Sequence, residues 1–148
     1  MNLTIERLDT SLPLPTYAHE GDSGMDLYAR PYADHYALDY IEIEPMGTVS
    51  IGVGIRLGIP DGYEIQIRPR SGMTREGIIT HFGTVDSGYR GEVMVNITNT
   101  NTYGMYRIYR KARIAQAILA PVTRAHIVEG VVENDTERGS NGFGSTGK

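Results

Sequence analysis

The sequence contains no cysteine, which excludes disulfide bonds, thiolate metal sites and a cysteine nucleophile. Its four histidines, at positions 19, 35, 81 and 126, are too scattered to suggest a zinc cluster. There is no excess of basic residues either, because the formal net charge is −4, and this argues against broad electrostatic attraction to nucleic acid. Any anion must therefore be bound by a local pocket.

Long hydrophobic runs are also missing. No apolar run approaches the roughly 18 residues that span a bilayer, so no membrane partner is expected. The first ten residues have neither the basic start nor the apolar stretch of a signal peptide. We therefore expect an unexported, cytoplasmic protein, or one in the cytoplasm or nucleus of a host cell if its source is viral. A chain of 148 residues has the size of one domain with its own core.

Arginine dominates the basic residues that are present. Lysine occurs only at positions 111 and 148, and the rest of the fourteen basic residues are arginine. The forked guanidinium suits bidentate contacts to phosphate or carboxylate better than diffuse charge does. Solvated surface and ion pairs between subunits are the alternative uses of these residues.

Apolar residues recur with period two through most of the chain, which is the pattern of half-buried β-strands. The clearest run is residues 49–57, for which we predict one long strand, with residues 63–67 returning as its hairpin partner. Further strands are expected at residues 3–5, 25–29, 41–43, 93–98, 105–109, 114–122 and 127–132. With no repeat and no long amphipathic helix, the fold class is predicted to be all-β.

The stretch 83–95 places a carboxylate and an aromatic residue in a glycine-punctuated turn between two β-type runs. Gly83 and Gly88 permit tight turns, so Asp86 is expected near the mouth of a hairpin. Taken alone, Asp86 would more often be a turn residue that caps its own backbone. The same holds for Asp26, at the start of the strand predicted over residues 25–29.

Two other segments contain polar groups that need a partner. Residues 71–77 predict one or two helical turns with Ser71 near the N-cap and Gly77 at the end. Beside Arg70, such a helix start is either an anion site or a plain capped turn. Gln116 lies in an apolar strand and must find a partner or water, since burying it unsatisfied costs about 1–3 kcal/mol.

The C-terminal residues are too rich in glycine and polar side chains to form a core. A disordered terminus is one interpretation. The other is an arm whose backbone N–H groups, hydroxyls and Arg138 wrap a phosphate while Phe143 stacks on a planar ring. We therefore divide the chain into a β domain at residues 1–132 and a flexible arm at residues 133–148.

Five stretches, in order, resemble one family, the trimeric deoxyuridine triphosphate nucleotidohydrolases or dUTPases. They span residues 17–147, and five motifs in order with family-like spacing are a specific signal. The five are Tyr17-Ala18 with Gly24-Met25-Asp26-Leu27, Pro69-Arg70-Ser71-Gly72, Gly83-Thr84-Val85-Asp86 with Tyr89-Arg90-Gly91, Arg113-Ile114-Ala115-Gln116, and Arg138-Gly139 with Gly142-Phe143-Gly144-Ser145-Thr146-Gly147.

The resemblance implies a jelly-roll-like β-barrel or sandwich of the β-clip kind, assembled as a homotrimer with active sites shared between chains. It implies Mg²⁺-dependent hydrolysis of dUTP to dUMP and pyrophosphate, which lowers dUTP and supplies dUMP for thymidylate synthesis. Asp86 is then the general base for a water that attacks the α-phosphorus in line. Mg²⁺ would be held mainly by the phosphates, with Asp26 supporting its waters.

The resemblance also assigns substrate contacts. Backbone groups of Thr84, Val85 and Met94 would pair with the uracil edge. Tyr89 would lie against the deoxyribose beside Asp86, leaving no room for a 2′-hydroxyl. The phosphate contacts would be Arg70, Ser71, Gly72, Gln116, Arg138, Gly144, Ser145 and Thr146, with Phe143 stacked on the nucleoside.

The sequence departs from the family in three places. Residues 21–24, Gly-Asp-Ser-Gly, stand where Gly-Ser-Ala-Gly is commoner. Residues 110–113, Arg-Lys-Ala-Arg, replace a usual Lys-Gly-Asp-Arg turn. The segment 77–86 is shorter than in many bacterial members and lacks their base-pocket asparagine, with Thr80 or His81 nearest to that place. Recognition of uracil is therefore expected to depend more on the backbone.

Three other functions are compatible with parts of the pattern. A dCTP deaminase of the same fold would use a glutamate, such as Glu92, to activate water at the base. A nucleotide-binding regulatory domain would bind without turnover, and a structural β-sandwich would bind no nucleotide. Asp86 with Tyr89-Arg90-Gly91 favours hydrolysis over deamination. A pure binding domain would not need Asp86 and the closing tail together with the phosphate segment.

Overall fold

The computed structural model describes residues 1–33 and 36–142, and the regular structure in them is almost entirely β-strand, which confirms the all-β fold class. These described residues include one short helix, α1, which spans Ser71–Arg75. No helix in the described ranges is long and apolar enough to cross a membrane. The strands are β1 Thr4–Arg7, β2 Met25–Tyr28, β3 Tyr32–Ala33, β4 Tyr36–Ala37, β5 Tyr40–Ile43, β6 Thr48–Gly52, β7 Ile55–Gly58, β8 Tyr63–Arg68, β9 Ile78–Thr80, β10 Gly83–Asp86, β11 Met94–Asn99, β12 Tyr106–Tyr109 and β13 Arg113–Pro121.

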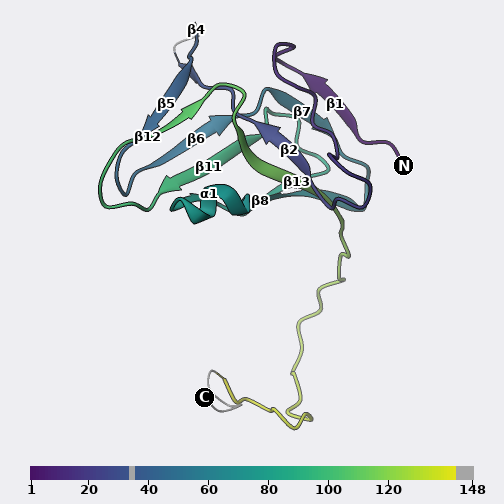
Figure 1. Cartoon of the computed structure of the whole chain (residues 1–148). Coiled ribbons are helices and arrows are strands. Elements are labelled where there is room, and N and C mark those ends of the chain that lie inside the picture. The colour runs from purple at the N-terminus through teal and green to yellow at the C-terminus, as the bar shows by residue number, and fades with distance from the viewer. Residues whose placement is uncertain (34–35, 143–148) are drawn as a thin grey trace.

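The strands pair in antiparallel sheets (Figure 1). The largest sheet has the order β10-β8-β13-β2, and a three-stranded sheet has the order β6-β11-β9. Three further pairs, β1-β7, β12-β5 and β3-β4, extend the body. Because sequence neighbours such as β10 and β11 lie in different sheets, the chain crosses repeatedly from one sheet to the other.

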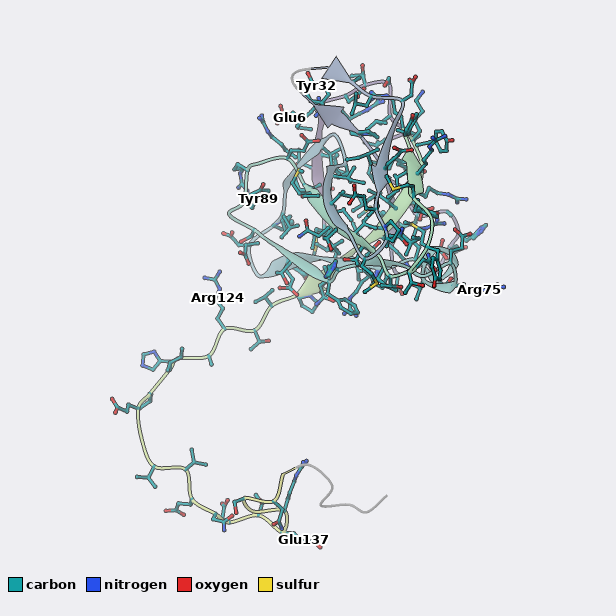
Figure 2. The ribbon with its side chains drawn as sticks, turned by 90° about the vertical axis from the view of Figure 1, so that its left-hand side faces the viewer. Glu6, Tyr32, Arg75, Tyr89, Arg124 and Glu137 are labelled. Carbon is teal, nitrogen blue, oxygen red and sulfur yellow. The ribbon has the colours of Figure 1, made fainter. Side chains whose placement is uncertain are left out.

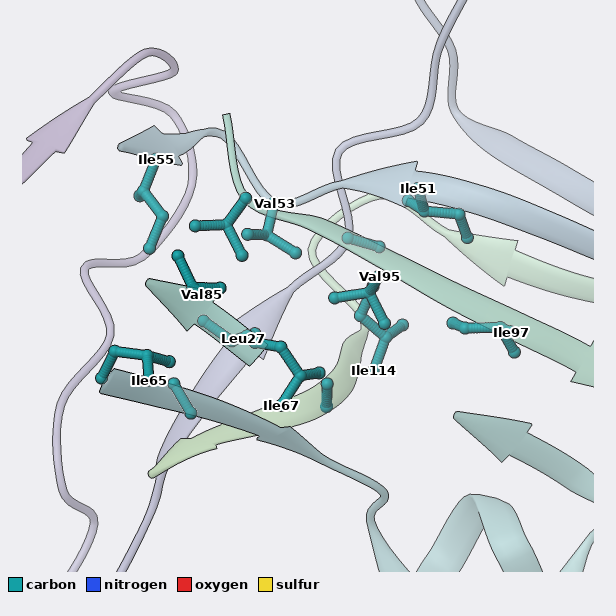
Figure 3. Packing of buried hydrophobic residues seen from close by; sticks show 14 of the residues in the cluster. Leu27, Ile51, Val53, Ile55, Ile65, Ile67, Val85, Val95, Ile97 and Ile114 are labelled. Carbon is teal, nitrogen blue, oxygen red and sulfur yellow. The ribbon is translucent and has the colours of Figure 1, made fainter. Parts of the chain in front are cut away.

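The core lies between these sheets (Figure 3). Ile65 of β8 and Ile114 of β13 are fully buried on one side, and Val95 and Ile97 of β11 are buried on the other. Full burial of one such aliphatic side chain contributes roughly 1.5–3 kcal/mol, so the facing apolar rows dominate the stability of the body.

The run 49–57 forms two strands rather than the one predicted. β6 ends at Gly52 and β7 begins at Ile55, and Gly54 between them has a φ of 69°. Glycine adopts this left-handed conformation without steric cost. This turn separates two different pairings. Before it, β6 pairs with β11, and after it, β7 pairs with β1. The alternating apolar residues from Ile51 to Leu57 are all buried across the break, so the period-two pattern does not reveal it.

Two predicted hairpins are also wrong. β8 pairs with β10 and β13 rather than with β7, and Asp86 lies opposite Glu64 in that register. β11, the next strand after Asp86, pairs with β6 and β9 in the other sheet. Asp86 is therefore the last residue of an edge strand, at the point where the chain crosses to the facing sheet.

The strand predicted at residues 127–132 is not formed in the single chain. Up to residue 142, where the description ends, β13 is the last regular element, and the segment beyond it runs away from the body (Figure 1). Ile127, Val128, Val131 and Val132 are 75–94% exposed there. A strand needs a partner for its backbone N–H and C=O groups, and within residues 1–33 and 36–142 this segment pairs with no strand.

The short helix forms where helical turns were predicted, but it begins one residue earlier than a cap at Ser71 implies. Arg70 is the N-cap, with extended backbone, and Ser71 is the first helical residue. Gly77, with a φ of 76°, ends the turn, and its N–H donates to the carbonyl of Thr74 at 3.1 Å.

Candidate functional site

A cavity of about 170 Å³ lies where β10 meets the loop that leads to β11, and we name it the Asp86 cavity. The five described residues that were predicted to contact the nucleoside all line it. A sixth lining residue, Val93, was missed because its place in the alternating pattern indicates only a core position. The lining residues are Thr84, Val85, Asp86, Tyr89, Val93 and Met94.

Strand alternation decides which side chains of β10 face outward. Val85 is buried, so its neighbours Thr84 and Asp86 project from the opposite face, and both are exposed. The Asp86 carboxylate therefore reaches solvent at the end of an edge strand. In this place it can accept a hydrogen bond from a water molecule and orient it.

Tyr89 is held against its own loop. Its hydroxyl donates to the carbonyl oxygen of Glu92 at 2.9 Å. A Cβ atom at Gly91 would lie 2.3 Å from the Tyr89 hydroxyl oxygen, so this fold of the loop requires glycine there. Arg90 braces the same turn, because its Nη1 donates to the carbonyl of Ser87 at 2.6 Å.

A second set of predicted residues gathers around Asp26 on β2. Arg70 Nε lies 2.9 Å from Asp26 Oδ1, and Arg113 Nη1 lies 3.3 Å from Oδ2. Gln116 of β13 lies opposite Asp26 and donates from Nε2 to the carbonyl of Pro69 at 3.1 Å. We name Asp26, Arg70, Arg113 and Gln116 the Asp26 group. Two guanidinium groups around one carboxylate leave a net positive charge, which favours an anion.

Arg113 was not predicted as a site residue. Simple alternation from Gln116 would place residue 113 on the other face of β13. The pairing of β13 with β2 shifts register between Arg113 and Ala115, and Arg113 contacts Asp26. Its only signal in the sequence is its place at the start of the fourth motif.

The start of α1 and a second cavity adjoin the Asp26 group. Ser71 and Gly72 are exposed in the first turn, where N–H groups have no acceptor within the helix. A Cβ at Gly24 would lie 2.9 Å from Gln116 Oε1, so glycine is needed at this close approach. The cavity, of about 180 Å³, is lined by Thr16, Ala18, Asp22, Ser23, Gly24, Asp26 and Gln116.

The Asp86 cavity and the Asp26 group lie at opposite ends of β8. Gln116 pairs with Arg68, whereas Asp86 pairs with Glu64. Four residues of strand correspond to about 13 Å. In Figure 2, Tyr89 and Arg75, the last residue of α1, lie on opposite sides of the body. A single chain therefore does not bring the predicted base together with the predicted phosphate contacts.

The predicted contacts of the tail are not brought to either place. Figure 2 shows Glu137 on the segment that leaves the body, and Arg138 follows it in the sequence. The Nε of Arg138 donates to the carbonyl of Asn141 at 3.2 Å. The other predicted tail contacts lie outside the described residues; they are Phe143, Gly144, Ser145 and Thr146.

The described residues contain no cluster of three or more histidine, cysteine, aspartate or glutamate side chains that could hold a metal ion. The Asp26 carboxylate carries the only negative charge in the Asp26 group. A divalent cation at this place would therefore need most of its oxygen ligands from a bound anion and from water. Mg²⁺ has that preference, because it keeps several waters and binds phosphate oxygens.

Residues considered for other roles have different contacts. Thr80 is buried and donates from its hydroxyl to the carbonyl of Ile114 at 2.7 Å, and His81 Nε2 lies 2.7 Å from Thr98 Oγ1. Neither lines the Asp86 cavity. Glu92, the residue considered for a deaminase, lines a neighbouring cavity instead.

Comparisons of the sequence point to one family. The dUTPase family model matches residues 10–147. A deoxyuridine 5'-triphosphate nucleotidohydrolase of Zymomonas mobilis is 44% identical over 152 residues, covering 99% of this chain and 98% of that protein. The protein of the same name from Clostridium kluyveri is 40% identical over 150 residues, covering 99% of both chains.

Solved structures show the same fold. The dUTPase of Staphylococcus bacteriophage 80alpha with dUPNHPP superimposes with a TM-score of 0.87, at 24% identity, with 99% of each chain covered. A mutant dUTPase from phage phi11 of S. aureus, described with a structural Mg(II) ion, gives a TM-score of 0.77 at 20% identity. That comparison covers 93% of this chain and 99% of the phage chain.

Proposed function

The chain belongs to the dUTPase family, and from this premise we propose that it is a dUTP diphosphatase that hydrolyses dUTP to dUMP and pyrophosphate. The Asp86 cavity carries the proposal. Five residues chosen from the sequence as nucleoside contacts line one cavity, with a solvent-accessible carboxylate at its edge. The reaction would lower dUTP and supply dUMP for thymidylate synthesis.

Asp86 acts as the general base in this proposal. Its carboxylate accepts a proton from a water molecule, whose oxygen forms the new bond to the α-phosphorus. The bond from that phosphorus to the bridging oxygen breaks, and pyrophosphate leaves with the bonding electron pair. Because Asp86 ends a strand whose register is fixed against β8, its backbone is held in place before substrate binds.

The walls of the Asp86 cavity would select the nucleoside. Backbone groups of Thr84, Val85 and Met94 would pair with the uracil edge. The Tyr89 ring would lie against the deoxyribose and exclude a 2′-hydroxyl by steric contact. The hydrogen bond from Tyr89 to the carbonyl of Glu92 supports this role, because it limits rotation of the ring.

The Asp26 group would bind the triphosphate. Arg70 and Gln116 supply side-chain contacts, and Ser71 and Gly72 supply backbone N–H groups. Asp26 orients Arg70 through the 2.9 Å ion pair. The arm at residues 133–148, with Arg138, would close over the substrate and complete the phosphate contacts.

The residues present fit Mg²⁺ held mainly by the substrate's phosphates. Asp26 would support the metal's waters, since a single carboxylate between two arginines is a poor direct site. When bound, Mg²⁺ would neutralise charge on the phosphate oxygens. The arginines and oriented N–H groups of the chain stabilise the same charge.

We also propose a jelly-roll-like homotrimer with active sites shared between chains. The roughly 13 Å along β8 between the Asp86 cavity and the Asp26 group supports this, because the attacked phosphorus must lie within reach of both. The exposed aliphatic side chains at residues 127–132 support it as well. They would be buried if this segment docked on another copy.

The test is pyrophosphate release from dUTP, dCTP, dTTP and UTP, each with and without Mg²⁺. Selective, Mg²⁺-dependent release from dUTP is the expected result. Ammonia release from dCTP would instead indicate a deaminase, and dUTP binding without turnover would indicate a regulatory domain. Absence of both binding and turnover would contradict the proposed function altogether.

A further inference from the structure

Glu92 and Arg30 form an ion pair in the cavity next to the Asp86 cavity, and Met94 lines both cavities. Arg30 Nη1 lies 3.0 Å from Glu92 Oε2, and the two side chains are only 17% and 22% exposed. The other carboxylate oxygen of Glu92 accepts a hydrogen bond from the Gly54 N–H at 2.8 Å. One carboxylate thus binds both a guanidinium group and the backbone at the break between β6 and β7.

Two glycines leave room for this carboxylate and its partner. A Cβ at Gly52 would lie 2.4 Å from Glu92 Oε1. At Gly54, where φ is 69°, a Cβ would lie 2.7 Å from Leu12 Cδ1 and 3.1 Å from Arg30 Cδ. The backbone around the ion pair therefore tolerates no side chain at either position without rearrangement.

Arg30 is fixed from a second side. Its Nε lies 3.5 Å from Asp9 Oδ2, and Asp9 also forms an ion pair with Arg110. The Arg30 guanidinium lies over the Tyr32 ring at 4.4 Å from the ring centroid. The partner of Glu92 is consequently held by charge and by stacking.

Glu92 in turn connects to the walls of the Asp86 cavity. Its carbonyl accepts the Tyr89 hydroxyl, and the next residue, Val93, exchanges backbone hydrogen bonds with Val53 (3.1 Å) and Ile55 (2.9 Å). Met94, one residue further, lines both the Asp86 cavity and the cavity beside Arg30. A shift of Glu92 would therefore displace lining residues on both sides of it.

We propose that the Glu92–Arg30 pair positions Tyr89 and Met94 and thereby sets discrimination between deoxyribose and ribose; this rests on the proposed function. The free-energy cost of removing two charges from water can equal or exceed their attraction, so a largely buried ion pair is poor evidence of added stability. The role proposed for the pair rests instead on its contacts, because Glu92 accepts the Tyr89 hydroxyl and lies two residues before Met94. Glu92 touches no reacting atom and is a positioning residue, distinct from Asp86.

The test is Glu92→Gln, which keeps the shape of the side chain and removes its charge. The measurement is kcat/KM for dUTP and for UTP, with thermal unfolding recorded in parallel. We expect KM for dUTP to rise and the dUTP/UTP ratio of kcat/KM to fall about tenfold, because a loosened Tyr89 ring no longer excludes the 2′-hydroxyl. A purely structural role would lower the melting temperature and leave the ratio unchanged.

Glu6→Gln is the matched control. Glu6 forms an ion pair with Arg56 at 3.6 Å, but both side chains are largely exposed, and Glu6 lies on β1. The same chemical change there should alter neither KM nor the ratio. A comparable loss of discrimination in Glu6→Gln would assign the effect to net charge and overturn the proposal.

A second variant reaches the carboxylate without changing any charge. Gly52→Ala places a methyl group against Glu92 Oε1 and should reproduce the lower dUTP/UTP ratio.

Tyr89→Phe removes the hydroxyl that donates to the carbonyl of Glu92. The double variant Tyr89→Phe with Glu92→Gln should therefore lower the dUTP/UTP ratio by less than the product of the two single-variant effects.

The outcomes separate this inference from the proposed function. A wild-type protein that does not cleave dUTP would defeat the proposed function. A wild-type protein that cleaves dUTP selectively, with folded Glu92→Gln or Gly52→Ala at the wild-type ratio, would overturn only the positioning role. Failure of both variants to fold would show the pair to be structural and would also overturn it.

Discussion

At the scale of single residues, Asp86 is the carboxylate on which turnover depends in the proposed reaction. Asp86→Asn should lower kcat for dUTP about 10²–10⁴-fold, since the amide cannot accept the water's proton. The dissociation constant for dUTP should change little, because shape and hydrogen-bonding size are kept. Pyrophosphate release and an equilibrium titration of dUTP binding measure the two effects.

Asp61→Asn is the control for that experiment, because Asp61 is exposed between β7 and β8 and does not line the Asp86 cavity. Its kcat should equal that of the wild type. An Asp86→Asn protein that retains more than about a tenth of wild-type kcat would rule out Asp86 as the general base.

The ionisation of Asp9, in the N-terminal segment, makes the free energy of unfolding depend on pH. Burial is the largest single influence on the pKa of Asp9, and it raises that pKa. Hydrogen bonds from the Ser11 hydroxyl and N–H and the contact with Arg110 together outweigh burial. They lower the pKa from 3.8 to about 2. A group whose pKa is lower in the folded state stabilises the fold above its unfolded pKa. Asp9 should therefore contribute about 2 kcal/mol to the free energy of unfolding near neutral pH.

This contribution should be lost as pH falls from about 4 to about 2. Urea unfolding of wild type and Asp9→Asn at several pH values measures it. The wild type should be the more stable protein at pH 6, and the difference should shrink toward pH 2. A difference in unfolding free energy that stays constant over this range would contradict the assignment.

At the scale of elements, the turn between β12 and β13 contains a residue in an unfavourable backbone conformation. Lys111 has a φ of 68°, in the left-handed region that costs a side-chain-bearing residue about 1–2 kcal/mol. Glycine is the usual residue at this position in the family's Lys-Gly-Asp-Arg turn. Lys111→Gly should therefore raise the free energy of unfolding by about 1 kcal/mol, after the entropy of the unfolded glycine is subtracted.

Lys111→Ala separates backbone relief from loss of the lysine charge. Alanine keeps the Cβ atom, so it should give no comparable gain in thermal or urea unfolding. Equal stabilisation by alanine and glycine would show that the charge, rather than φ, makes Lys111 unfavourable.

Elements differ in how far the sequence predicts them. The positions of β1, β2 and β8 follow from period-two patterns, because alternation reports directly on burial, and β13 follows from its apolar run. Their partners do not follow, since pairing depends on turns such as the one at Gly54, where φ is positive and the sheet changes. The strand expected at residues 127–132 fails for a related reason, because its apolar residues have no partner strand among the described residues of one chain.

The candidate site likewise contains residues that the sequence predicts and residues that it does not. Five of the six residues that line the Asp86 cavity were predicted, because they are close in sequence and lie in or just after one motif; Val93 was missed. The Glu92–Arg30 pair was not predicted, because its members are 62 residues apart and each resembles an ordinary surface charge in the sequence. Only the folded chain shows that Gly52 and Gly54 admit them to the same place.

At the scale of the whole molecule, the separation of the Asp86 cavity from the Asp26 group leads to a test of the shared site. Asp86→Asn and Arg70→Ala should each be inactive, one through loss of the base and the other through loss of a phosphate contact. If one site takes Asp86 and Arg70 from different chains, a mixed trimer contains sites in which both residues are intact.

Refolding the two inactive proteins together should therefore restore activity. With random assembly, each site has about one chance in four of receiving both intact residues, so roughly a quarter of wild-type pyrophosphate release is expected. Each variant refolded alone controls for the procedure and should stay inactive. If both residues of a site came from the same chain, no mixture could assemble an intact site. A refolded mixture that forms trimers and remains inactive would thus place Asp86 and Arg70 in one chain's site, despite the length of β8 between them.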